Sequence, residues 1–74
     1  MMLIAIHYAH PAQINSIKLE VKKHGFYSAY CESVIVGLSD HAVLIEQIKK
    51  IALQANLIVT FNKAQNVCIF EAKT

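Results

Sequence analysis

The amino-acid sequence predicts a single α+β domain over residues 1–74, with two helices on one face of a mainly antiparallel sheet. Two observations support this fold class. Apolar residues recur at helical spacing in two stretches, and short runs rich in β-branched and aromatic residues lie before, between and after them. The order is strand, helix, strand or strand pair, helix, strand, strand. It fits a ferredoxin-like split βαβ layout, βαββαβ plus an extra C-terminal strand.

The first half of the chain predicts a strand followed by a helix. The apolar run Met2–Ala9 is typical of a buried central strand. Apolar residues at helical spacing predict a helix over Ala12–His24, and Gly25 is suited to end it. The stretch Phe26–Leu38 is strand-like throughout and contains no turn dipeptide. We therefore expect this stretch to form one bent strand or two strands.

The second half of the chain predicts a helix and a hairpin. Ser39 or Asp40 is expected to cap the helix start, and Asn56 is expected to end it in a left-handed conformation. The strands Leu57–Phe61 and Val67–Glu71 flank a polar turn and should pair as a hairpin. The predicted apolar stripe of the helix consists of Val43, Leu44, Ile48, Ile51 and Ala52.

The apolar content of the chain predicts self-association. Hydrophobic residues make up 55% of only 74 residues, and a domain of this size cannot hide that much apolar surface alone. Large exposed apolar patches usually mark interfaces, and two-fold dimers are the commonest way to cover them. We therefore expect a homodimer formed through the sheet face that the helices leave open.

The charge pattern restricts the kinds of partner. The chain has seven lysines, five acidic residues and no arginine. Arginine is the usual bidentate ligand of phosphate and guanine, so its absence weakens nucleic acid as a partner and favours a protein partner. Lysine still binds phosphate as a point charge, which leaves duplex DNA or RNA as a partner. A protein partner is the alternative.

The cysteines and the lengths of the apolar runs indicate a compartment. Cys31 and Cys68 lie inside strand-like apolar runs and are expected to be buried thiols in a reducing environment, with a Cys31–Cys68 bridge as the alternative. No apolar run reaches the roughly 18 residues that a membrane-spanning helix needs. We therefore expect a cytoplasmic protein with no membrane partner.

Three stretches of the sequence resemble a known family: IAIHYA, VKKHGF and SVIVGLSDHAVLIEQIKKI. They are similar to the small CRISPR-associated nuclease, the second Cas protein, which partners the integrase in spacer acquisition. They are also similar to its relatives, the virulence-associated protein D ribonucleases. The resemblance covers most of the chain. It implies a ferredoxin-like homodimer that associates with nucleic acid.

In that family an aspartate follows the aromatic residue at the end of the first strand and is proposed to hold a divalent metal, such as magnesium. Tyr8 matches the aromatic residue, but Ala9 occupies the position of the aspartate. The resemblance therefore implies a protein without a metal cofactor and without the metal-dependent nuclease activity. Binding of nucleic acid or of a partner is the leading expectation.

Two sets of residues are candidates for a functional site. Tyr8 and His10 are candidate catalytic residues of a metal-independent ribonuclease or toxin–antitoxin component, because histidine can act as a general base near neutral pH. A third hypothesis is a small protein-interaction module or inhibitor, which needs neither set. The candidate nucleic-acid contacts are Lys18, Lys22, Lys23, Lys49, Lys50 and Ser33.

Overall fold

The computed structural model describes residues 11–73. Its first element is helix α1 (Pro11–His24). The helix ends at Gly25, whose backbone has a φ of +89°. The N–H of Gly25 donates to the carbonyl oxygen of Val21 at 2.8 Å. Residues with a Cβ rarely adopt this conformation, so glycine is well suited to this position. The predicted helix is thus confirmed and begins one residue earlier than expected.

Strand β1 (Phe26–Tyr30) is followed at once by a single helical turn, α2 (Cys31–Val34). The prediction of extended structure through Leu38 is therefore wrong beyond Tyr30. Cys31 and Val34 are both buried. A helical turn places residues three apart on one side, whereas a strand would point these two side chains to opposite faces. Burial of this pair overrides the β-propensity of the run.

Helix α3 (His41–Ala55) begins and ends as the sequence predicts. The carboxylate of Asp40 accepts a hydrogen bond from the N–H of Val43 at 3.2 Å, and Asn56 is left-handed with a φ of 59°. The predicted apolar stripe is wrong at one position, because Val43 is 41% exposed and Ile45 is buried in its place. The buried residues of α3 are Leu44, Ile45, Ile48, Ile51, Ala52 and Ala55.

Strands β2 (Leu57–Phe61) and β3 (Val67–Ala72) form the predicted antiparallel hairpin. Its turn contains no glycine and is held by Asn62, whose side-chain oxygen accepts from the N–H groups of Asn66 and Val67 at 2.9 and 3.0 Å. Strand β3 also pairs antiparallel with β1, so the strand order is β1-β3-β2. The last strand of the described chain is therefore the central strand of the sheet.

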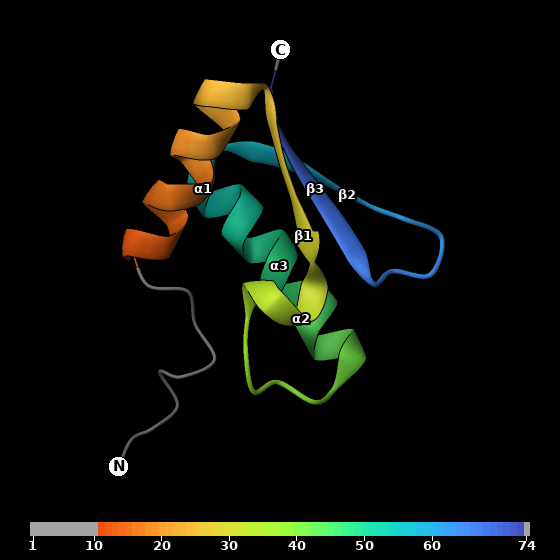
Figure 1. Ribbon diagram of the computed structural model, residues 1–74. Coiled ribbons are helices and arrows are strands. Elements are labelled where there is room, and N and C mark those ends of the chain that lie inside the picture. Colours follow the sequence, from red (N-terminus) through yellow and green to blue (C-terminus); the bar gives the residue numbers. More distant parts are fainter. Residues whose placement is uncertain (1–10, 74) are drawn as a thin grey trace.

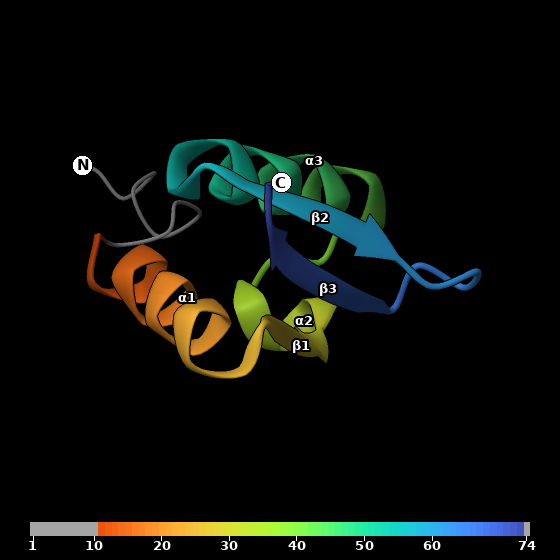
Figure 2. The same ribbon diagram turned by 90° about the horizontal axis from the view of Figure 1, so that it is seen from above.

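Helices α1 and α3 pack side by side on one face of the sheet, α1 mainly against β1 and α3 against β2 (Figures 1 and 2). The core between the layers is apolar, and Ile48, Cys68 and Phe70 are fully buried in it. The opposite sheet face carries Phe26, Tyr30 and Ile58, which are 50%, 63% and 43% exposed.

The α+β class, the antiparallel sheet and the placement of two helices on one face are confirmed. The arrangement is consistent with a small fold of the ferredoxin-like type. The predicted strand Met2–Ala9 lies outside the described residues, so the first strand of the expected βαβ layout stays a prediction.

Packing around Ile48 should contribute measurably to stability. We expect Ile48→Val to lower the free energy of unfolding by about 1 kcal/mol, because it removes a buried methyl group and leaves a small cavity. Leu53→Ala on the same helix is the matched control, since Leu53 is 73% exposed and its truncation should change stability by less than about 0.5 kcal/mol. Urea unfolding of both variants measures the difference, and equal losses would contradict this description of the core.

Candidate functional site

The predicted lysines lie on the two helices that cover the sheet, and all five are exposed. Helices α1 and α3 together carry five lysines and two glutamates, a formal charge of +3. The rest of the chain carries two lysines and three acidic residues, a formal charge of −1. The positive charge of the protein is therefore concentrated on the helix layer, defined here as α1 and α3.

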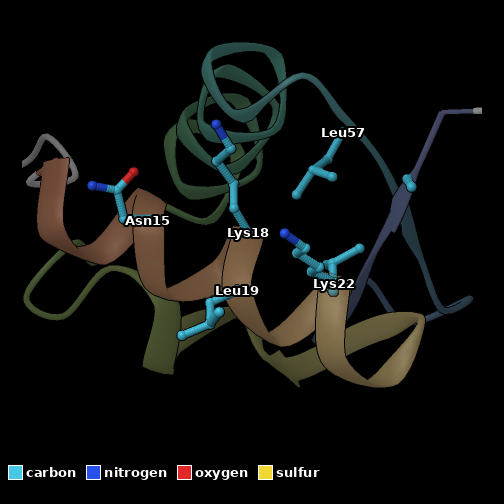
Figure 3. A pocket seen from close by; sticks show the side chains of 7 residues that line it. Asn15, Lys18, Leu19, Lys22 and Leu57 are labelled. Atoms are coloured by element: carbon cyan, nitrogen blue, oxygen red, sulfur yellow. The ribbon is translucent and has the colours of Figure 1, made fainter.

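Lys18 and Lys22 lie one helical turn apart on α1 and line a shared groove (Figure 3). The wall opposite them comes from Leu57, at the start of β2, and Ala72, at the end of β3. The groove has a volume of about 610 Å³ and a mainly apolar lining. Figure 3 shows the Lys18 side chain extending up from α1 on the side where Leu57 lies. Two cationic groups thus border one depression of the surface.

The carboxylates of the helix layer are engaged elsewhere. Glu46 lies 3.6 Å from the Nζ atom of Lys49, and Glu20 lies 3.4 Å from the Nε2 atom of His24. Within residues 11–73, neither Lys18 nor Lys22 has a carboxylate within ion-pair distance. Both ammonium groups therefore border the groove without a carboxylate partner, and Lys23 and Lys50 likewise have no ion pair among the described residues.

The other candidate residues do not join this pair. Ser33 lies on α2, is exposed and does not line the groove. Lys23 is exposed on α1 but does not line the groove either. Tyr8 and His10 fall outside the described residues, so the ribonuclease hypothesis that depends on them stays a prediction.

Both cysteines are buried free thiols, as the sequence predicts. The Cys31 S–H donates to the carbonyl oxygen of Gln65 at 3.5 Å, and the Cys68 S–H donates to that of Ala29 at 3.6 Å. Burial raises the pKa of the Cys31 thiol, and it raises the pKa of Cys68 from 9.0 to about 12. A nucleophilic cysteine needs a lowered pKa, so neither thiol is suited to catalysis.

Two further features are absent from the described part of the chain. No group of three or more His, Cys, Asp or Glu residues within residues 11–73 is placed to hold a metal ion. No described helix combines the length and the apolar character needed to cross a membrane.

Comparison with known proteins found no matching family model, no matching curated protein and no matching solved structure.

The groove itself was not predicted from the sequence. Its lysine side was visible as an i,i+4 pair on the first helix. Its apolar side could not be found in this way, because Leu57 and Ala72 are distant in sequence from α1 and from each other.

The raised cysteine pKa values predict slow chemical modification. A pKa of about 12 in place of 9.0 lowers the thiolate fraction of Cys68 at pH 8 about a thousandfold. We expect a thiol reagent such as Ellman's reagent to label the native protein far more slowly than the urea-unfolded chain. Labelling at equal rates would contradict the burial of Cys68.

The same shift predicts weaker folding in alkali. Below pH 9 the thiol of Cys68 is protonated in both folded and unfolded chains, so its contribution to stability is constant. As the pH rises from 9 towards 12, the unfolded chain loses this proton first and gains stability relative to the fold. We expect the urea midpoint of the wild type to fall over this pH range. The urea midpoint of Cys68→Ala should fall less steeply.

Proposed function

We propose that the protein binds nucleic acid through its helix layer. The observation that carries this proposal is the charge distribution, since five of the seven lysines lie on α1 and α3. Lysines that neutralise phosphates release condensed counterions, so binding should be tighter at low salt and insensitive to base sequence. Because the chain has no arginine, contacts to phosphate would fall to lysine, which binds it as a point charge.

The resemblance of three sequence stretches to the CRISPR-adaptation and virulence-associated D nucleases supports the same class of partner. Because Ala9 replaces the metal-binding aspartate of that family, we propose association with nucleic acid without metal-dependent cleavage. The buried free thiols support a reducing, cytoplasmic location.

We also propose that the protein is a homodimer. The observation that favours this is the open sheet face, where Phe26, Tyr30 and Ile58 are each 43% exposed or more. Exposed apolar residues gathered on one face usually mark a contact with another chain. A dimer also doubles the number of lysines that a nucleic acid can contact.

The first test is fluorescence anisotropy of labelled duplex DNA and of single-stranded RNA, titrated with the protein at several salt concentrations. For duplex DNA the logarithm of the affinity should fall linearly with that of the salt concentration, by about 0.9 for each phosphate neutralised. Lys18→Gln/Lys22→Gln should weaken binding and lower this slope by about 1.8 per protein copy, if each lysine contacts one phosphate.

The matched control is Lys63→Gln/Lys73→Gln, which removes the same charge from outside the helix layer. It should leave the salt slope nearly unchanged. An equal effect of both double variants would show that only net charge matters and would contradict a defined binding surface. No binding at the lowest salt concentration would refute the proposal.

A further inference from the structure

Strand β1 presents a free edge with a regular row of backbone hydrogen-bonding groups. Within the described residues, β1 pairs only with β3. The N–H of Cys31, directly after β1, donates to the Asn66 carbonyl oxygen at 2.9 Å and so points towards β3. Because backbone groups alternate in direction along a strand, those of Tyr27 and Ala29 also face β3. The backbone groups at the free edge belong to Phe26, Ser28 and Tyr30.

Among the described residues, this edge carries none of the usual protection against pairing with another chain. Exposed edge strands generally carry lysine, proline or a bulge that blocks association. Strand β1 has the sequence FYSAY, with no charged residue and no proline. Its outward side chains Phe26 and Tyr30 are 50% and 63% exposed, and they flank the small residue Ser28. An uncharged edge with two exposed aromatic residues is well suited to pairing with another strand.

We propose that β1 pairs antiparallel with β1 of a second copy, in a register centred on Ser28. This inference rests on the homodimer proposed above and confines its contact to the β1 edge of the open face, which carries Phe26 and Tyr30 but not Ile58. In this register Ser28 of one copy faces Ser28 of the second copy, and Phe26 of each copy faces Tyr30 of the other. All three residue pairs are of the hydrogen-bonded type, each exchanging two N–H···O bonds, so about six bonds form across the two-fold axis.

The same register covers the exposed aromatic side chains. Residues directly opposite each other in an antiparallel pair point to the same face of the sheet, and aromatic pairs there are stabilising. Phe26 and Tyr30 of one copy therefore meet Tyr30 and Phe26 of the other. Aromatic residues stand at both ends of F-Y-S-A-Y, so a two-fold contact centred on Ser28 sets aromatic against aromatic on both sides of the axis.

Two other contacts between copies fit the structure less well. The opposite edge strand, β2, could also pair with its own copy, in a register centred on Val59. That register would set Ile58 against Thr60 and would bring no two aromatic side chains together. Face-to-face packing of the open sheet would use an area of about 15 Å by 17 Å, from three strand spacings and five residues of rise. A contact of this small outline would join the two copies through side chains alone. Edge pairing adds main-chain hydrogen bonds and so depends less on area.

The proposed contact has a consequence for the helix layer. The two-fold axis lies between the two Ser28 residues and is perpendicular to the sheet. It joins two three-stranded sheets into one sheet of six strands and keeps both helix layers on the same side. The lysines of both copies then form one continuous basic surface. Face-to-face packing would instead place the two helix layers on opposite sides of the dimer.

The test is the oligomeric state of the full chain, measured by sedimentation velocity over a range of protein concentrations. Ser28→Pro removes an N–H that points to the free edge and leaves the β1–β3 ladder intact, so the monomer should still fold. We expect the wild type to be a dimer and Ser28→Pro to raise the dimer dissociation constant at least about tenfold. A wild-type monomer at all concentrations, or an unweakened Ser28→Pro dimer, would overturn the proposal.

A cross-linking pair of variants tests the register independently of the folding of Ser28→Pro. Opposed Ser28 residues would have Cα atoms about 5.5 Å apart, but the Cβ atoms of a hydrogen-bonded pair are about as far apart, beyond the roughly 3.5–4.5 Å of a disulfide. A short bismaleimide, which bridges two thiols by adding one to each of its rings, should therefore cross-link Ser28→Cys into a covalent dimer. Thr60→Cys is the control, because Thr60 lies in the same cross-strand row through Ile69 but on β2, and it should remain uncross-linked.

The cross-linking outcomes separate the contacts. Equal cross-linking of both cysteine variants would indicate face-to-face packing and overturn edge pairing, and so would no cross-linking of either. Nucleic-acid binding is a separate readout. A Ser28-linked dimer that binds no nucleic acid refutes the proposed function alone, whereas a monomer that binds nucleic acid refutes only the strand pairing.

Discussion

The structure depends on the central position of β3. This strand pairs with β1 on one side and β2 on the other, and its inward side chains Cys68 and Phe70 are fully buried beneath α1 and α3. Within residues 11–73, β1 and β2 do not pair with each other, and hydrogen bonds to β3 hold both of them in one sheet. The two edges, the open face and the groove wall at Ala72 all take their positions from this one strand.

The fold class could be predicted from sequence because its local signals agree with its packing. Gly25, Asp40 and Asn56 have backbone or side-chain chemistry that ends or begins a helix, and each does so in the structure. The prediction of extended structure through Cys31–Val34 is wrong for the opposite reason, because the local signals there do not agree with the packing. A four-residue helix is too short to show a period, and its β-branched and apolar residues are those of a strand, so only the tertiary burial of Cys31 and Val34 distinguishes the two.

The candidate site also has one part that could be predicted from the sequence and one part that could not. The concentration of lysines on two helices follows from the sequence once the helices are placed, because exposed positions of an amphipathic helix can be read from its apolar stripe. The groove beside Lys18 and the free edge of β1 could not be predicted, because both depend on strand order. A prediction that placed β1 anywhere but at an edge would have hidden the outward backbone groups of Ser28.

The late position of the central strand in the sequence also affects how the chain can fold. Phe26 pairs with Glu71 across 45 residues, and β1 has no other partner strand among the described residues. A ribosome must therefore synthesise nearly all of these residues before β1 can pair with β3, its partner in the described sheet. Folding of such a non-local sheet is slow relative to that of a helical bundle, because loop closure precedes the gain from pairing. An uncharged strand such as β1 is open to pairing with another chain during that interval.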